Sequence, residues 1–324
     1  MAAVTYLEAI RQAIWEEMER DSRVFVLGED VAIYGGAFKV TEGFIHKFGM
    51  ERVVDTPISE MAIASAAYGA SLTGLRPVAE FQFMDFISSA HSQIVQILAK
   101  SNWRWGAPAP LVLRGPSGGG VSGGPFHSQN PEMFYVHTPG LKVIAPATAR
   151  DAKGLMKSAI RDNNPVLFFE HKFLYRRVKE ELPQEDYTIE IGKARVHREG
   201  RDLSVITYGA MLYTAQEAAD LLAKEDIQLE IIDLRTLLPL DREAIRRTTE
   251  KTNRVLVLHE DTKTGGIAGE IAAIINEEAF DALDAPIARI AALDAPVPFS
   301  PPLEKAFLPQ VGDVVREARR LVKY

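Results

Sequence analysis

Apolar residues along the first half of the chain fall into short continuous runs separated by longer mixed segments. The runs with the length and composition of strands are 24–28, 76–83, 110–115, 141–146 and 165–170. The segments between them with the length and composition of helices are 57–73, 88–103 and 150–161. Continuous apolar strands separated by helices are typical of a parallel sheet covered on both faces, so this half predicts an α/β domain.

The alternation stops in a charged stretch and then resumes. Residues 178–200 carry many charges, include Pro183 and lack a sustained apolar period, which is typical of a linker. Beyond it, strand-like runs and helical patterns alternate through 203–209, 211–224, 229–236, 241–250, 254–260 and 267–278. We therefore expect a first α/β domain at 1–178, a linker at 179–200 and a smaller α/β domain at 201–324.

The amino-terminal residues predict an amphipathic helix. Leu7, Ile10, Ile14 and Met18 recur on one face of a helical pattern. The same segment carries several acids, so we interpret it as neither a signal nor a transit peptide. The sequence contains no apolar run of the roughly 18 residues that a membrane helix needs.

Composition narrows the class of protein. The 324 residues are 47% hydrophobic and 25% charged, as in a globular protein, and include no cysteine. Without cysteine there is no disulfide or thiolate metal site, which agrees with a reducing compartment. The formal net charge of −7 gives no basic footprint for nucleic acid. We expect a cytoplasmic protein that handles a small molecule and has neither a nucleic-acid nor a membrane partner.

A single acid precedes an uncharged helical segment. Glu60 is followed by MAIASAAYGASLTG, in which no residue is charged. Thr56 and Pro57 predict the N-cap and the first turn of this helix. We expect protein to surround such a helix, where a carboxylate is costly unless it has a partner or serves a ligand. An exposed Glu60 would only complement the helix dipole, and the local sequence leaves both interpretations open.

The stretch RGPSGGGVSGGPFHSQNPE is rich in glycine. Gly118, Gly120 and Gly123 satisfy the spacing G-x-G-x-x-G. The dinucleotide-binding fingerprint also needs a following helix and an acid ~20 residues later, whereas these glycines run into Pro125. We expect a mobile loop that brings backbone close to a ligand and presents His127. A structural or surface role for that histidine stays open.

Short ordered blocks of sequence extend over nearly the whole chain. They are GEDV, TEGF, DTPISE, GLRPVAEFQF, HSQNPE, PGLKVIAP, DAKGL, AIRDNNPV and IIDLRTLLPLD. Together they resemble the beta subunits of the thiamine-diphosphate-dependent 2-oxoacid dehydrogenases, the decarboxylating components of the pyruvate and branched-chain complexes. The resemblance implies a transketolase-like α/β fold, in which a parallel-sheet pyrimidine-binding domain precedes a smaller carboxyl-terminal domain.

The resemblance also implies roles for individual residues. Glu60 matches the acid that hydrogen-bonds the aminopyrimidine ring of the cofactor and favours the imino tautomer needed for proton removal. His127 matches a histidine near the substrate carboxylate and the lipoyl arm, where it donates a proton or orients a group during reductive acylation. The implied cofactor-binding residues are Glu29, Ile58, Glu60, Gln82 and Phe86. The implied ligands of a structural K+, mostly through carbonyl oxygens, are Leu111, Ala159, Asp162 and Asn164.

One family motif is absent from the sequence. Thiamine enzymes hold the diphosphate and Mg2+ with a GDG motif followed by an asparagine pair, and no GDG occurs here. The resemblance therefore implies that an alpha subunit holds the diphosphate and Mg2+ in an α2β2 heterotetramer. It also implies that the carboxyl-terminal domain docks the peripheral binding domain of a lipoyl acyltransferase, whose lipoyl domain receives the acyl group.

The blocks point to more than one substrate. HSQNPEMF, FFEHKFLYR, the spacing of Gln82 and Asp85 and the ending LEKAFLP…VKY resemble the branched-chain type. DTPISEM and RGPSGG resemble the pyruvate type, and Phe86 stands where the branched-chain type has a tyrosine. We favour branched-chain 2-oxoacids, followed by pyruvate or broad specificity, and then by an acetoin-cleaving relative. Two alternatives of other classes are an NAD-dependent dehydrogenase, which rests on the glycine spacing alone, and a non-catalytic scaffold that recruits the acyltransferase.

Overall fold

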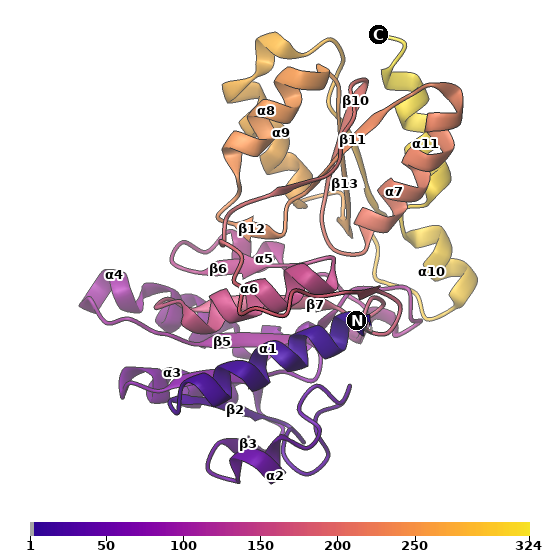
Figure 1. The fold of residues 1–324 in the computed structure, drawn as a ribbon. Coiled ribbons are helices and arrows are strands. Elements are labelled where there is room, and N and C mark those ends of the chain that lie inside the picture. The colour runs from indigo at the N-terminus through magenta and orange to yellow at the C-terminus, as the bar shows by residue number, and fades with distance from the viewer. Residues whose placement is uncertain (1–2) are drawn as a thin grey trace. The chain divides into compact units, whose positions relative to one another are not determined.

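The computed structural model describes residues 3–324, which form two compact units (Figure 1). Among the described residues, the first unit comprises 3–117 and Phe134–Ile191, and the second comprises Gly118–Met133 and Gly192–Tyr324. The glycine-rich segment 118–133 thus packs with the second unit, although it interrupts the first along the chain. Within the described range, no helix is both long and apolar enough to cross a membrane.

A parallel sheet forms the centre of the first unit. Its strands are β2 (Val24–Gly28), β3 (Val53–Asp55), β4 (Arg76–Glu80), β5 (Val112–Ser117), β6 (Lys142–Ile144) and β7 (Val166–His171). They are neighbours in the order β6-β7-β5-β4-β2-β3, and every pair is parallel. All six residues of β5 and of β7 are buried, so both faces of these strands are covered. The predicted parallel sheet is confirmed.

The predicted amino-terminal helix is α1 (Tyr6–Arg20). It begins with a capping box, in which Thr5 and Glu8 bond each other's backbone N–H groups. The four apolar residues of its predicted face are all buried. The remaining helices of this unit are α2 (Phe44–Phe48), α3 (Glu60–Leu72), the short 3₁₀ and π turns over 84–100, α4 (Ser101–Trp105), α5 (Met133–Val136) and α6 (Ala149–Arg161).

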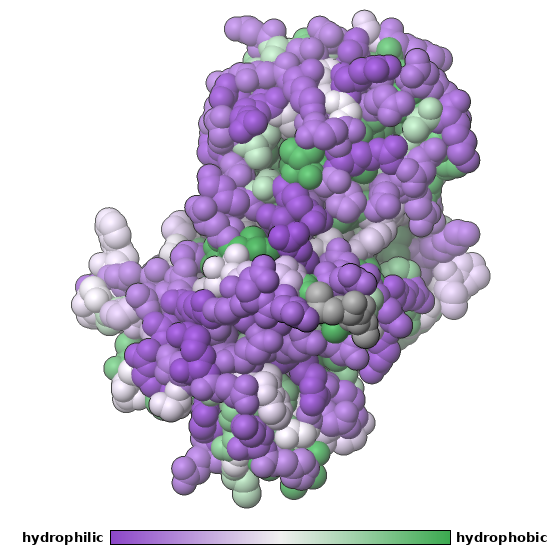
Figure 2. All heavy atoms as spheres, viewed as in Figure 1, coloured by the Kyte–Doolittle hydropathy of each residue, from purple (hydrophilic) through white to green (hydrophobic). Residues whose placement is uncertain are grey.

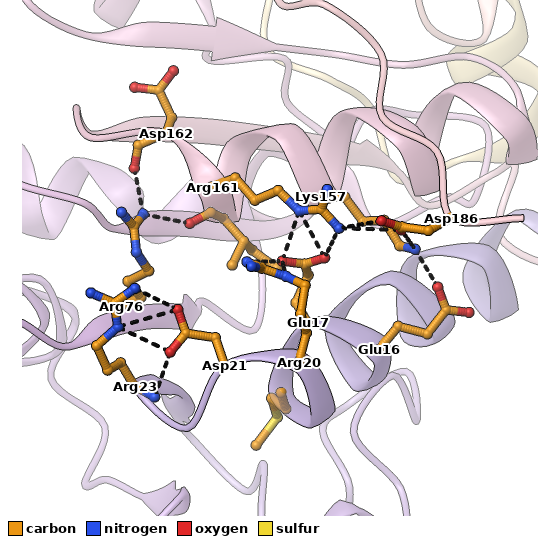
Figure 3. Close-up of polar contacts among 12 residues, drawn as sticks. Glu16, Glu17, Arg20, Asp21, Arg23, Arg76, Lys157, Arg161, Asp162 and Asp186 are labelled. Carbon is orange, nitrogen blue, oxygen red and sulfur yellow. Dashed lines mark hydrogen bonds and ion pairs between the residues drawn. The ribbon is translucent and has the colours of Figure 1, made fainter.

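Charged side chains join α1 to α6. Glu17 is fully buried on α1 and accepts hydrogen bonds from Arg20 and Arg161 (Figure 3). Lys157 of α6 pairs with Glu16 and with Asp186. A buried carboxylate is costly unless it is paired, and two guanidinium groups provide that pairing here. These contacts fix α1 against α6 in addition to the apolar face.

The second unit contains a mostly parallel sheet. Its strands are β9 (Arg195–Arg198), β10 (Leu203–Thr207), β11 (Leu229–Asp233), β13 (Val255–Thr262) and β14 (Ala288–Ala292), in the order β14-β13-β10-β11-β9. The unit also contains β12 (Thr236–Leu238), α7 (Met211–Leu222), α8 (Arg242–Thr252), α9 (Ile267–Glu278), α10 (Pro301–Phe307) and α11 (Val311–Leu321). In Figure 1, α8 and α9 cover one face of this sheet, and α7 and α11 cover the other.

The stretch expected to be a linker contains regular structure. Its first residues form β8 (Lys179–Glu180), which pairs with β1 (Val4–Thr5). Its last residues form β9, which pairs antiparallel with β11 at the edge of the second sheet. An edge strand has one neighbour and pairs through its backbone, so its side chains need not be apolar. The polar sequence of β9 therefore gave no strand signal.

Hydrophilic residues predominate on the face shown in Figure 2, and apolar residues occur there in small separate areas. This distribution agrees with the globular composition and with the net charge of −7.

Candidate active site

Three strand ends bring the predicted cofactor-binding segments together. β2 is the neighbour of both β3 and β4, and Gly28 at its end is in register with Asp55 and Glu80. The residues that follow these three ends therefore lie along one edge of the parallel sheet. They carry Glu29, Ile58, Glu60, Gln82 and Phe86. The carboxyl edge of a parallel sheet is where α/β proteins bind ligands.

Glu60 is the first residue of α3, and its side chain is half-buried. The predicted N-cap at Thr56 is wrong, because the Thr56 N–H donates to the Gly28 carbonyl at 2.9 Å and extends the β2–β3 pairing. Helix α3 begins after that extension, with Ser59 at the N-cap position and no side-chain cap. The expectation that protein surrounds this helix holds for one face only, since Met61 is 50% exposed in this chain.

Glu29 is a buried acid at this edge of the sheet. It is 4% exposed, and its Oε1 atom has no hydrogen-bond partner among the described residues. Burial raises the pKa of Glu29, and the negative charges of Glu60 and Asp30 raise it further. Glu29 and Glu60 therefore act on each other electrostatically. A buried carboxyl group with an unused oxygen beside a second carboxylate is suited to hydrogen-bonding a heterocyclic nitrogen and to exchanging a proton with it.

Apolar and aromatic residues flank the two acids. Ile58 is 82% exposed although its side chain is apolar. Gln82 is half-buried just beyond β4, between the fully buried Phe81 and the half-buried Phe83. The rings of Phe83 and Phe86 meet edge to face, with centroids 6.1 Å apart. These side chains can line the faces of a planar ring whose polar edge meets the acids.

A buried polar network behind this edge was missed at the sequence level. Arg114 is 1% exposed, and its guanidinium bonds both Glu80 and Glu170, with an Nη2–Oε2 distance of 2.7 Å to Glu170. The Tyr175 hydroxyl donates to Glu170 at 2.7 Å. Burial raises the pKa of Glu80 despite the opposing effect of Arg114. The network ties β4, β5 and β7 together. Its signal in the sequence was a charged residue within each of three largely apolar strands.

The loop between β2 and α2 packs directly on this network. Gly36 has φ of +79°, and a Cβ atom there would lie 2.6 Å from Glu80 Oε1. Only glycine combines this backbone conformation with so close an approach. The buried network thus supports the loop that begins at Glu29.

His127 belongs to the second unit. It is half-buried and directly follows the single 3₁₀ turn Gly124–Phe126. The glycine-rich segment therefore lacks the long helix that the dinucleotide-binding fingerprint requires. The segment is also held by hydrogen bonds from its backbone, which differs from the expected mobile loop.

The predicted K+ ligands come from adjacent segments of the first unit. They are Leu111, Ala159, Asp162 and Asn164. Arg76 donates to the carbonyl oxygens of Ile160 and Asp162, both at 2.9 Å (Figure 3), and Lys142 pairs with the Asp162 carboxylate. A carbonyl oxygen has two lone pairs, so one hydrogen bond leaves room for a cation. Among the described residues, no cluster of His, Cys, Asp or Glu could hold a metal ion, so such a site would depend on carbonyl oxygens.

Comparison with known proteins gives one consistent result. Residues 2–178 match the family model "Transketolase, pyrimidine binding domain", and residues 192–314 match "Transketolase, C-terminal domain". The chain is 50% identical to 2-oxoisovalerate dehydrogenase subunit beta and 45% identical to pyruvate dehydrogenase E1 component subunit beta, both from Bacillus subtilis, over 100% of each chain. A mitochondrial pyruvate dehydrogenase beta subunit from Oryza sativa is 43% identical, over 98% of this chain and 86% of the relative. A solved split-gene transketolase shares the fold, with a TM-score of 0.81, 22% identity and 99% coverage of both chains.

Proposed function

Because the chain belongs to the family of 2-oxoacid dehydrogenase beta subunits, we propose that it acts on branched-chain 2-oxoacids. Enzymes of this family decarboxylate a 2-oxoacid oxidatively and pass the acyl group to a lipoyl acceptor. They use thiamine diphosphate, and a beta subunit works with an alpha subunit. The identity of 50% to the 2-oxoisovalerate enzyme, against 45% to the pyruvate enzyme, supports the branched-chain substrates. Pyruvate is the second candidate, because the difference is small.

The convergence of three strand ends on Glu29 and Glu60 carries the assignment of the site. Glu60 would hydrogen-bond the aminopyrimidine ring of thiamine diphosphate and thereby support proton removal by the cofactor. Burial, and then the charges of Glu60 and Asp30, raise the pKa of Glu29, which favours its protonated form beside Glu60. Ile58 and Phe86 exclude water from the ring, and Gln82 hydrogen-bonds its edge. The unpartnered oxygen of Glu29 fits a polar ligand at this place.

Thiamine diphosphate, when bound, supplies the electron sink that loss of carbon dioxide requires. The alpha subunit holds its diphosphate and Mg2+, since this sequence has no GDG motif. The two kinds of subunit assemble as an α2β2 heterotetramer. His127 serves at the lipoyl acceptor, and the second unit docks the peripheral binding domain of the acyltransferase. The carbonyl oxygens near Asp162 bind K+.

Activity assays on the reconstituted heterotetramer test these roles. With an artificial electron acceptor, we expect turnover of the three branched 2-oxoacids to exceed that of pyruvate, and no turnover by the isolated beta chain. Glu60→Gln should abolish this turnover while the heterotetramer still assembles in size-exclusion chromatography. The exposed Glu51, replaced by Gln, is the matched control and should keep normal activity. Turnover by the isolated chain, or near-normal turnover by Glu60→Gln, would contradict the proposal.

A further inference from the structure

Two buried carboxylates of the second unit hold the backbone of the glycine-rich segment 118–133. Glu260, near the end of β13, accepts hydrogen bonds from the Gly119 N–H and from the Asn130 side-chain amide, the latter at 3.0 Å. Glu304 of α10 accepts from the N–H groups of Gly120 and Ser122, both at 2.9 Å. Glu260 is 5% exposed and Glu304 is 4% exposed. We call this pair of acids the carboxylate clamp.

The backbone of the segment is shaped for these acids. Gly118, Gly120, Ser122 and Gly124 all have positive φ, between 58° and 84°. Alternation of left-handed residues with ordinary ones turns successive N–H groups to one side and forms a concave anion-binding nest. A Cβ atom at Gly119 would lie 3.4 Å from a carboxylate oxygen of each clamp residue. In this chain the anions in the nest are its own side chains.

Glu304 uses both of its oxygens. Gly120 donates to Oε1, whereas Ser122 donates to Oε2 through its N–H and, at 3.2 Å, through its hydroxyl. A carboxylate offers two acceptor oxygens, whereas a Gln side chain of the same shape offers one oxygen and an NH2 donor. Glu304→Gln therefore replaces one acceptor oxygen with an NH2 group, which cannot accept the hydrogen bond from the backbone N–H that faces it. Because the two side chains have the same shape, the change opens no cavity.

The backbone that the clamp holds is hydrogen-bonded to the residues next to His127. Gly118 donates its N–H to the Gln129 carbonyl at 2.9 Å, and Gly123 donates its N–H to the Ser128 hydroxyl at 3.1 Å. The clamp thus holds the amino-terminal half of the segment, and that half bonds the two residues that follow His127. A glycine-rich segment has a large conformational freedom to lose, so an imposed backbone needs such contacts.

We propose that Glu260 and Glu304 are positioning residues for His127 and thereby for reductive acylation of the lipoyl group. This inference rests on the proposed role of His127. Without the clamp, the segment samples more conformations, and His127 spends a smaller fraction of time where it can assist the reaction. The acylation rate falls with that fraction, whereas decarboxylation at the first unit continues.

The test compares two reactions of the reconstituted heterotetramer. One is decarboxylation with an artificial electron acceptor, and the other is acylation of an added lipoyl domain. Glu304→Gln should lower kcat of acylation by about 10- to 100-fold, the range expected when a catalytic group is misplaced. Its decarboxylation rate should stay within about twofold of wild type. Glu277→Gln, which alters a 63%-exposed carboxylate of the same unit, is the matched control and should change neither rate.

A double variant separates positioning from a general structural role. In the His127→Ala background, Glu304→Gln should cause no further loss of acylation, because the clamp acts through that histidine. A further loss of the same size would overturn the inference, and so would normal acylation by Glu304→Gln beside an impaired His127→Ala. Normal acylation by His127→Ala would instead overturn the proposed role of His127 and this inference with it. Asn130→Ala, which removes one bond to Glu260, provides the same test if Glu304→Gln does not fold.

Discussion

Replacement of Arg114 by Met should destabilise the first unit strongly. The Arg114 guanidinium bonds Glu80 and Glu170, whose side chains are 4% and 0% exposed. Met has a similar length and is apolar, so the change removes the positive charge without opening a large cavity. It leaves two carboxylates buried without their cation.

The expected loss of unfolding free energy is about 3–5 kcal/mol, as when one partner of a buried ion pair is removed. The loss depends on pH, because burial already raises the pKa of Glu80 and removal of Arg114 raises it further. A carboxyl group whose pKa is higher in the folded state favours folding below its ordinary pKa. That contribution is lost as the pH rises through the raised value. The destabilisation should therefore be larger at pH 8 than at pH 5.

Urea unfolding followed by tryptophan fluorescence measures this loss. Trp15 of the first unit packs edge to face against Phe44 and Phe48, so its emission reports the unfolding of that unit. Trp103 and Trp105 are 95% and 57% exposed in the folded chain and contribute little to the change. With a slope of roughly 2 kcal/mol per M, the urea midpoint should fall by about 1.5–2.5 M. The triple variant with Glu80→Gln and Glu170→Gln should recover much of the loss, because it buries no charge. A single-variant loss under about 1 kcal/mol, or no recovery in the triple variant, would refute the reasoning.

Two further substitutions test the local physics of each unit. Gly36→Ala should cost over about 1 kcal/mol, because it adds both left-handed strain and a contact with Glu80, whereas Gly49→Ala, with φ of +76° and open space around it, adds strain alone. Equal midpoints of the two variants in urea would contradict the predicted contact. In the second unit, burial raises the pKa of Asp261 to about 6 and lowers that of His259 to about 4, so acidification through this range favours folding at Asp261 and opposes it at His259. Asp261→Asn should therefore lose stability more steeply than wild type between pH 6 and 4 in circular-dichroism melts, and parallel pH profiles would count against it.

Local sequence patterns were sufficient to predict most of the helices and strands. The strand predicted at 24–28 is β2, and the apolar face predicted for the amino-terminal helix is buried in α1. Both follow from side-chain periodicity, which the backbone geometry of one element sets by itself. The resemblance that pointed to the beta subunit family likewise rests on blocks of adjacent residues. Recognition of the family, now confirmed by the matches over the whole chain, therefore needed no structure.

Pairings between distant residues could not be read in this way. Thr56 is a residue type that favours the N-cap of a helix, yet its N–H bonds the Gly28 carbonyl and extends a strand pairing. Strand β9 has a polar sequence, yet it pairs with β11 in a sheet. The clamp acids lie 141 and 184 residues from the glycines that they bind, and Arg114 lies 56 residues from Glu170. A hydrogen bond between such distant residues does not change the spacing of apolar and polar residues near either partner, so the sequence pattern does not reveal it. The sequence determined which elements form and which family they belong to. Only the tertiary structure decided which buried charges pair and what holds the segment that carries His127, because those contacts exist only once the chain has folded back on itself.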